Sequence, residues 1–152
     1  MMTKRPLLVA ILTILAAATI TTTAQAQTSA DSAAIVATSL DYIEGWYTGD
    51  AVRMERALHP DLAKRIVFSD AETGQSKLGD MSADQLIAGA ERGVGKNSPN
   101  KRADVAILDI FENMATVRVD AGGWVDYLQI ARWNNEWVII NVLWEVRPEQ
   151  DS

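Results

Sequence analysis

Beyond residue 30, the first large apolar residues of the chain follow the spacing of a helix. Four of them recur at steps of four, three and four residues, which places them on one helical face: Val36, Leu40, Ile43 and Tyr47. Tyr42 and Trp46 widen this face. Asp31 or Ser32 is positioned to cap the start of the helix, and Gly49 ends it. The pattern therefore predicts a first amphipathic helix between these caps.

A second, shorter helix is predicted directly after the first. Asp50 is placed to cap it, and it runs from Ala51 to about Leu58. Because Pro60 disfavours the α-helical backbone at His59, the helix is expected to end there.

The next stretch is predicted to form a strand, a turn and a third helix. Apolar residues favour a strand over residues 62–69, and residues 71–75 form a polar turn. Residues 82–85 match a capping box, which predicts the start of a helix. Glycines at 93 and 95 end this helix, and residues 96–101 are predicted to be a loop.

The remainder of the chain has the alternation of apolar and polar residues that is typical of strands. Four strands separated by short turns are predicted: residues 105–111, 116–121, 124–133 and 136–146. The order is helix, helix, strand, helix and then four strands in a meander. This order predicts the α+β class, with three N-terminal helices packed on one face of an antiparallel sheet.

The last strand indicates which residues face the helices. One of its alternating sets is wholly apolar: Val138, Ile140, Val142, Trp144 and Val146. We assign this set to the helix-covered face, because successive side chains of a strand point to opposite faces. The other set, which includes Trp137, Ile139 and Leu143, is too apolar for a fully wetted face, so a homodimer through the outer sheet face is expected. For residues 124–133, the periodicity does not decide which set points inward.

The N-terminus has the three regions of a secretory signal peptide. Lys4 and Arg5 give a basic start, the run from Leu7 to Ile20 is apolar, and Ala24 to Ala26 match the small-x-small cleavage pattern. The alternative is an uncleaved anchor, but the apolar run is shorter than the roughly 20 residues that span a bilayer.

We therefore expect residues 1–26 to be a signal peptide and residues 27–152 to be one domain that is periplasmic or secreted. Cleavage removes Lys4 and Arg5, which changes the net charge from −6 to −8. The predicted mature chain has no second apolar span, so no membrane association is expected after cleavage.

Composition excludes several classes of function. The chain has no cysteine, so it has no disulfide and no thiolate metal site. With a single histidine as well, a zinc site is not expected, and no motif calls for a cofactor. The acidic balance argues against nucleic acid as a partner, since no basic stripe is available to meet phosphates.

Two segments resemble the putative lumazine-binding family of the nuclear transport factor 2-like (SnoaL-like, cystatin-like cone) superfamily. The first runs from Tyr42 to Asp50 and continues through Ala57–Asp61 to Lys64-Arg65. The second covers Trp124–Leu128 and Trp137–Glu145. The resemblance implies a strongly curved sheet whose three helices close a conical cavity, and it implies dimers. It does not assign an activity, because this superfamily hosts many unrelated ones.

Two residues are candidates for acid/base catalysis. His59 is the only histidine, and histidine exchanges protons near neutral pH; the alternative is a helix-terminal histidine whose cation is favoured by the helix dipole. Asp126 lies in the middle of a strand, where aspartate is rare. It is either a cavity carboxylate that acts as general base, or an outward carboxylate paired with Arg118 or Arg132.

Seven residues are candidates for ligand binding. They are Tyr42, Trp46, Arg65, Trp124, Tyr127, Asn141 and Trp144. Tyr42 and Trp46 lie one helical turn apart and could form a stacking wall, although aromatic side chains at this spacing also suit a plain core. Asn141 interrupts an apolar run and could bind a ligand, a dimer mate or a turn. The basic pair Lys64-Arg65 either binds an anionic group or is ordinary surface charge.

Three functions compete on these observations. The first is an exported protein that binds a small molecule, such as a planar heterocycle, in a cone-shaped pocket. The second is a metal-free isomerase, dehydratase or cyclase that uses Asp126 and His59 for proton transfer. The third is a dimeric module that binds another exported protein.

Overall fold

The computed structural model describes the backbone of residues 17–148 and the side chains of residues 29–148. The chain divides into two units, residues 1–33 and residues 34–152. In the first unit, the described residues form the beginning of helix α1 (Ala17–Thr48). Residues 1–16 of the predicted signal peptide lie outside the described residues, so the boundary between signal peptide and domain stays a prediction.

Helix α1 begins well before the predicted cap at Asp31 or Ser32, so this predicted start was wrong. The stretch between Ala17 and Asp31 contains neither proline nor glycine and is rich in alanine, the strongest helix former. Nothing in this stretch therefore ends the helix before it reaches the amphipathic segment.

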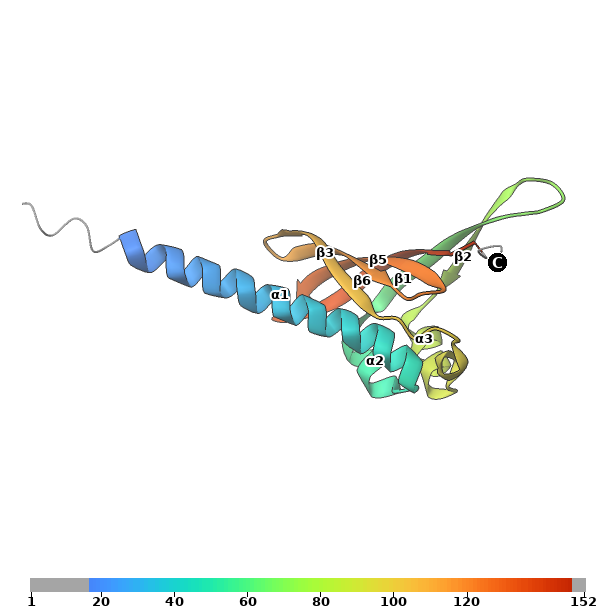
Figure 1. Ribbon diagram of the computed structural model, residues 1–152, viewed down its shortest axis with the longest axis horizontal. Helices are drawn as coiled ribbons and strands as arrows, with labels where there is room; N and C mark the ends of the chain where they lie inside the picture. Colours follow the sequence, from blue (N-terminus) through green and yellow to red (C-terminus); the bar gives the residue numbers. More distant parts are fainter. Residues whose placement is uncertain (1–16, 149–152) are drawn as a thin grey trace, which may run out of the picture. The chain divides into compact units, whose positions relative to one another are not determined.

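The second unit contains the remainder of α1 and all other described elements (Figure 1). Its shorter helices are α2 (Ala51–Ala57), α3 (Ala83–Glu91) and the 3-10 turn η1 (Val94–Asn97). Its strands are β1 (Leu58–Ser69), β2 (Ser76–Met81), β3 (Asp104–Phe111), β4 (Met114–Asp120), β5 (Trp124–Trp133) and β6 (Glu136–Val146). The α+β fold class is therefore confirmed, with three helices on one face of a curved six-stranded sheet.

The strands lie in the order β2-β1-β6-β5-β4-β3. The meander from β3 to β6 is antiparallel throughout, as the sequence predicts. Strand β1 pairs in parallel with β6. After β1 the chain forms β2 at one edge of the sheet and then passes through α3 to β3 at the opposite edge. This parallel pair brings residues of β1 next to the centre of the sheet, where the pocket described below is built.

Strand β2 and the first residues of β1 were not predicted. Strand β2 carries few apolar residues, and its pairing with β1 defines it. Strand β1 begins at Leu58 and includes Pro60, which has no backbone N–H. Pro60 is tolerated because it lies in the stretch where the register with β6 shifts and where β2 does not yet pair.

A β-bulge in β6 changes which residues face the helices. Gln129 pairs with Asn141, but Ile130 pairs with Ile139, which leaves Ile140 as the extra residue. Trp137 and Ile139 therefore join Val142 in the core below the helices. The prediction that residues 138 and 140 face the helices was wrong, because one extra residue reverses the alternation. For residues 142 and 144 the prediction was correct.

The core itself joins the helices to the inner face of the sheet. Its helical side chains come from α1, α2 and α3: Ile35, Tyr42, Ile43, Tyr47, Met54, Ala57, Leu86 and Ala90. On strand β5, Leu128 and Ile130 are buried against them, whereas Tyr127 and Gln129 are exposed. This settles the facing of β5, which its sequence left open.

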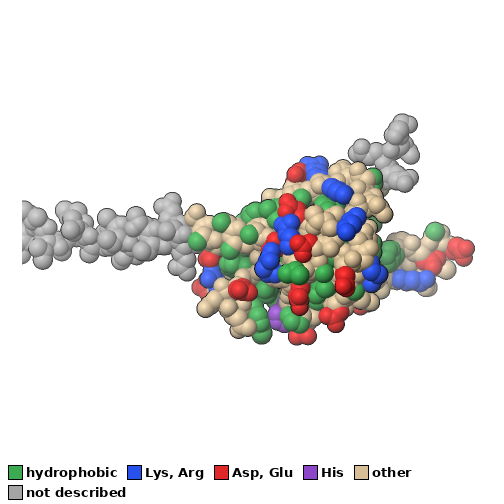
Figure 2. Space-filling model, turned by 90° about the horizontal axis from the view of Figure 1, so that it is seen from below, with side chains coloured by type: hydrophobic (Ala, Val, Ile, Leu, Met, Phe, Trp, Pro, Cys, Tyr) green, Lys and Arg blue, Asp and Glu red, His purple; other side chains and the backbone are tan. Residues whose placement is uncertain are grey.

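Helices α1 and α2 are also joined by ion pairs. Arg53 contacts Asp41 at 2.9 Å and Glu44 at 2.6 Å, and Arg56 contacts Asp41 at 2.8 Å. Figure 2 shows a face of the molecule on which acidic and basic side chains are interspersed. Such partly exposed pairs each contribute about 0–1 kcal/mol, so they orient α2 more than they stabilise it.

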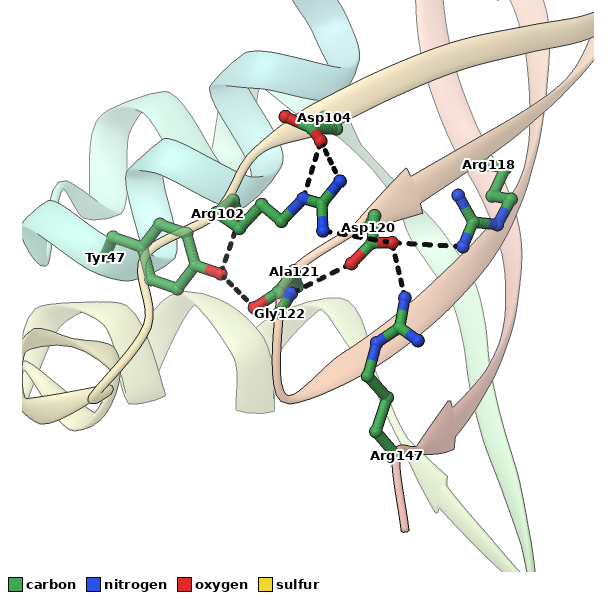
Figure 3. A network of polar contacts seen from close by, with 8 residues as sticks. All are labelled: Tyr47, Arg102, Asp104, Arg118, Asp120, Ala121, Gly122 and Arg147. Carbon is green, nitrogen blue, oxygen red and sulfur yellow. Dashed lines mark hydrogen bonds and ion pairs between the residues drawn. The ribbon is translucent and has the colours of Figure 1, made fainter. Parts of the chain in front are cut away.

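A cluster of three arginines surrounds the buried carboxylate of Asp120 at one end of the sheet (Figure 3). Arg118 lies 3.1 Å from its Oδ2, Arg102 lies 3.9 Å away, and Arg147 makes a short contact. The backbone N–H of Gly122 donates to Oδ1 at 3.1 Å. Through these contacts the carboxylate connects Arg102 before β3, Gly122 in the β4–β5 turn and Arg147 after β6.

Burial opposes ionisation of Asp120, but the Gly122 N–H and the arginines outweigh it and hold the pKa of this carboxyl below its usual value. A lowered pKa in the folded state contributes stability above the unfolded value of about 4, and this contribution is lost as the pH falls through the folded-state pKa.

We predict that Asp120→Asn lowers the free energy of unfolding by about 1.5–3 kcal/mol at neutral pH, the range for hydrogen bonds to charged groups. The wild type should lose stability more steeply than the variant below about pH 4. Urea unfolding of both proteins across this pH range measures the effect, and Asp104→Asn, at an exposed carboxylate of the same cluster, is the control. Parallel pH profiles for wild type and Asp120→Asn would contradict the assignment.

Candidate functional site

A cavity of about 330 Å³ lies in the second unit between the helices and the inner face of the sheet. Its lining is almost entirely apolar and aromatic, and it comes from every layer of the unit: Tyr42, Ile43, Trp46, Lys64, Met81, Leu86, Val94, Trp124 and Trp144. A volume near the lower end of the range for small-molecule sites suits a ligand of one or two rings.

A buried ion pair forms the polar end of this pocket. Lys64 on β1 donates from Nζ to Asp126 on β5, in a short contact, and to the Tyr42 hydroxyl at 2.7 Å. The second oxygen of Asp126 accepts from the indole N–H of Trp124 at 2.7 Å. The side chain of Asp126 is fully buried, so each of its oxygens has a protein donor in place of water.

The surroundings shift the pKa values of Lys64 and Tyr42. Burial lowers the pKa of the Lys64 ammonium, and the Asp126 carboxylate only partly offsets this effect. Burial, followed by the negative charge of Asp126, raises the pKa of Tyr42 well above its usual value. Tyr42 therefore stays a neutral hydroxyl, while Lys64 releases its proton more readily than an exposed lysine.

Two aromatic rings complete the surroundings of the Lys64 amine. Its Nζ lies 4.7 Å from the centre of the Trp144 ring and 5.4 Å from that of the Tyr42 ring. Both distances are within the range for cation–π attraction. The rings thus supply part of the stabilisation that the ammonium loses when it leaves water.

Strand register brings these groups together. Lys64 pairs with Val142, and Asp126 pairs with Trp144, two residues further along β6. All of them point to the inner face, because Leu62 and Ile66, which share the phase of Lys64, are also buried. The lysine and the aspartate therefore meet diagonally over the central strand.

Two glycines give Trp46 its place in the pocket wall. A Cβ at Gly89 would come within 2.8 Å of the Trp46 ring, and a Cβ at Gly95 within 2.3 Å of the Trp46 carbonyl oxygen. Helix α3 and the turn η1 can therefore approach α1 closely only because both positions lack a side chain.

The structure divides the predicted ligand-binding residues between two faces of the sheet. Tyr42, Trp46, Trp124 and Trp144 line the inner pocket. Arg65, Tyr127 and Asn141 lie on the opposite face, where they line a separate hollow together with Gln129 and Leu143. Asn141 donates to Gln129 at 3.0 Å on that face, so these three residues are not placed to contact a ligand held in the inner pocket.

His59 does not meet Asp126. Its Nδ1 accepts the backbone N–H of Asp61 at 3.1 Å, and its ring packs edge-on against Trp133 with centroids 4.7 Å apart. Trp133 is seven residues from Asp126 along β5, which is about 23 Å at 3.3 Å per residue. The two predicted acid/base residues are therefore separated by most of the length of the sheet.

The partner of Asp126 is Lys64, and not Arg118 or Arg132, which one of the two interpretations of the sequence had proposed. Arg118 contacts Asp120, and Arg132 packs over the Trp137 ring. A signal for Lys64 was present in the sequence, because this lysine occupies the buried phase of β1 between Leu62 and Ile66. A lysine among buried positions of a strand needs a buried carboxylate as its partner. Asp126 was the carboxylate in the middle of a strand for which the sequence had left two explanations open.

We predict that Lys64→Met lowers the free energy of unfolding by about 3–5 kcal/mol, because it leaves Asp126 buried without its counter-charge. The double variant Lys64→Met/Asp126→Leu should recover most of this loss, since both charges are then absent. Urea unfolding measures both effects, with Lys77→Met, at an exposed lysine paired with Asp70, as the matched control. A loss in the double variant equal to the sum of the losses measured for Lys64→Met and for Asp126→Leu alone would contradict the assignment.

Two further properties of the described residues bear on the site. No group of three or more His, Cys, Asp or Glu side chains among them is arranged to hold a metal ion. Within residues 17–148, no helix combines the length and the hydrophobicity that crossing a membrane requires.

Solved structures with the same fold are found in several bacteria. An NTF-2 like protein of unknown function from Silicibacter pomeroyi DSS-3 is 22% identical, with a TM-score of 0.59 over 79% of this chain and 98% of that one. One from Shewanella baltica OS155 is also 22% identical, with a TM-score of 0.60 over 80% and 97%. An NTF2-like protein with a cystatin-like fold from Novosphingobium aromaticivorans is 12% identical, with a TM-score of 0.59 over 86% and 91%.

These likenesses establish the fold and confirm the expectation of a cystatin-like, NTF2-like domain. No curated protein matches the chain. The sequence profile of the family described as "Putative lumazine-binding" matches residues 30–145, which is most of the chain and includes both segments that carry the resemblance. The chain belongs to the putative lumazine-binding family.

Proposed function

We propose that this is an exported protein that binds an uncharged, planar small molecule in the inner pocket. The observation that carries the proposal is the pocket itself, an apolar and aromatic cavity of about 330 Å³ with one balanced ion pair at its polar end. The family description, "Putative lumazine-binding", supports a small heterocycle as the ligand.

The chemistry of the lining supports an uncharged ligand. The ammonium of Lys64 and the carboxylate of Asp126 neutralise each other, so the pocket offers no net charge to an ion. Burying an unpaired charged ligand there would add a large desolvation cost. A neutral ring system would instead stack on Trp46, Trp124 or Trp144, with a polar edge toward Tyr42 and Lys64.

Support for export comes from the N-terminal sequence, with its basic start, apolar run and small-x-small site before Gln27. We expect the protein to be recovered from an exported fraction with Gln27 as its first residue, as mass spectrometry would measure. A chain that keeps Met1 and stays with the membrane would instead be an anchored protein.

Ligand binding is tested with a panel of pterins and other neutral heterocycles of one or two rings, with three-ring flavins as larger probes. Binding should raise the melting temperature and change the tryptophan fluorescence, because three tryptophans line the pocket. No stabilisation by any member of the panel would contradict the proposal.

Two matched variants identify the site of binding. Val94 is 54% exposed at the pocket, so Val94→Trp should fold normally and obstruct the cavity. Val67 is 47% exposed on β1 and does not line this pocket, so Val67→Trp is the control. We expect Val94→Trp to weaken binding at least about tenfold, which is 1.4 kcal/mol, and Val67→Trp to leave it unchanged. Equal effects of both substitutions would place the ligand elsewhere.

The proposed assembly is a homodimer through the outer sheet face, defined here by the exposed side chains Phe111, Met114, Tyr127 and Leu143. Each of these residues is about half exposed or more, and large apolar side chains exposed on one face of a sheet favour association. The polar residues Arg65, Gln129 and Asn141 lie beside them and could hydrogen-bond across the interface.

We predict that Leu143→Arg converts the dimer to a monomer, because it places a charge among these exposed apolar side chains. Light scattering coupled to size-exclusion chromatography measures the mass. Val52→Arg, at a valine of α2 that is 68% exposed, is the matched control and should remain a dimer. A wild-type protein that is monomeric at micromolar concentration would contradict the proposed assembly.

A further inference from the structure

Lys64 differs from every other lysine in the described part of the chain. Lys77, Lys96 and Lys101 are exposed, whereas Lys64 is only 4% exposed and lines the inner pocket. Its amine lies beside a carboxylate and a phenol, with an apolar cavity next to it. An amine in such a place combines the two requirements of a lysine nucleophile, which are a shielded site and an adjacent acid/base group.

We infer that Lys64 forms an imine with an aromatic aldehyde or ketone held in the inner pocket, with Asp126 as the group that moves the protons. The inference rests on the proposed function, since the carbonyl compound must first bind in this pocket. It adds a covalent step and a substrate class to that function.

The reaction begins with proton transfer from the Lys64 ammonium to the Asp126 carboxylate, which gives a neutral amine and a neutral acid. The amine lone pair forms a C–N bond to the carbonyl carbon, the C=O π bond opens, and the oxygen takes the proton from Asp126. The carboxylate then removes one proton from the new ammonium nitrogen. Asp126 returns this proton to the hydroxyl group, which leaves as water while the C=N bond forms.

The balance of atoms and charge favours this pair of residues. A protonated lysine and a carbonyl compound give a protonated imine and one water, without any oxidant or other reactant. The protonated imine keeps a positive charge beside the Asp126 carboxylate, as the ammonium did. The ion pair on which the interior depends is therefore present before and after the reaction.

The surroundings of the amine favour the forward reaction. Burial lowers the pKa of Lys64, so more of the amine is neutral at a given pH than in an exposed lysine. The aromatic walls hold a ring beside the amine, which replaces a bimolecular encounter by an oriented contact. The Tyr42 hydroxyl accepts a hydrogen bond from the amine at 2.7 Å, so it is placed to hydrogen-bond the developing hydroxyl of the ligand.

The experiment uses the mature chain, 2-naphthaldehyde and sodium cyanoborohydride at pH 7.5, which reduces an imine to a stable amine. Peptide mapping by mass spectrometry then locates the adduct, and the chain's α-amino group is counted separately. We expect Lys64 to be labelled at least about tenfold faster than Lys77, Lys96 or Lys101, because the aromatic pocket holds the aldehyde in contact with this amine alone. Asp126→Asn should slow labelling of Lys64 and leave the three exposed lysines unchanged.

A carbonyl-free probe separates the failure of this inference from the failure of the proposed function. Binding of 2-methylnaphthalene, followed by tryptophan fluorescence, measures access to the pocket without any covalent step. If it binds while Lys64 is labelled no faster than the exposed lysines, the imine is overturned and the binding function stands. If it does not bind and Lys64 is not labelled selectively, both are overturned.

One variant serves as a chemical control. Lys64→Arg keeps a cation beside Asp126 but cannot form an imine, so the adduct in this peptide should be lost. An adduct in the same peptide of this variant would overturn the assignment to Lys64. The comparison among lysines of the wild-type chain decides the question even if this variant does not fold.

Discussion

The interior of the domain depends on the ion pair between Lys64 and Asp126. Moving each charge out of water costs several kcal/mol, and their attraction repays this only when every remaining hydrogen-bonding site is satisfied. Here the phenol of Tyr42 and the indole of Trp124 supply these bonds from α1 and β5. The pair therefore fixes the positions of one helix and two strands around a single point, and the walls of the pocket are built outward from it.

A pocket persists above this pair because four of its nine lining residues are large, stiff aromatic side chains. Trp46, Trp124 and Trp144 are held at their backbones by α1, β5 and β6 and cannot collapse into the space as a methionine would. The close approach at Gly89 and Gly95 fixes the position of Trp46 from the other side. An ion pair that anchors rigid aromatic walls is better suited to hold a flat molecule than to fill a core.

The sequence was sufficient for most of what depends on local pattern, although the capping signal at Asp31 or Ser32 placed the start of α1 too late. The helical spacing around Ile43 and the alternation along β5 predicted the helices, the meander and the α+β class, and the four aromatic residues of the pocket were identified. What failed depends on pairing between distant strands. The bulge at Ile140 reverses one alternation, and the parallel pairing of β1 with β6 brings Lys64 to Asp126 while it leaves His59 near Trp133. No single-strand periodicity contains that register.

The arginine cluster around Asp120 is connected to the pocket through Trp124. Ala121, which follows Asp120, accepts a hydrogen bond from the Tyr47 hydroxyl and donates its N–H to the carbonyl of Trp124. The Tyr47 ring packs edge-on against the Trp124 ring with centroids 6.0 Å apart. Trp124 in turn donates to Asp126. Two buried carboxylates on adjacent strands thus act on one tryptophan, Asp120 through the turn that precedes it and Asp126 through its indole. The arginine cluster at the end of the sheet therefore helps to set the orientation of one wall of the pocket.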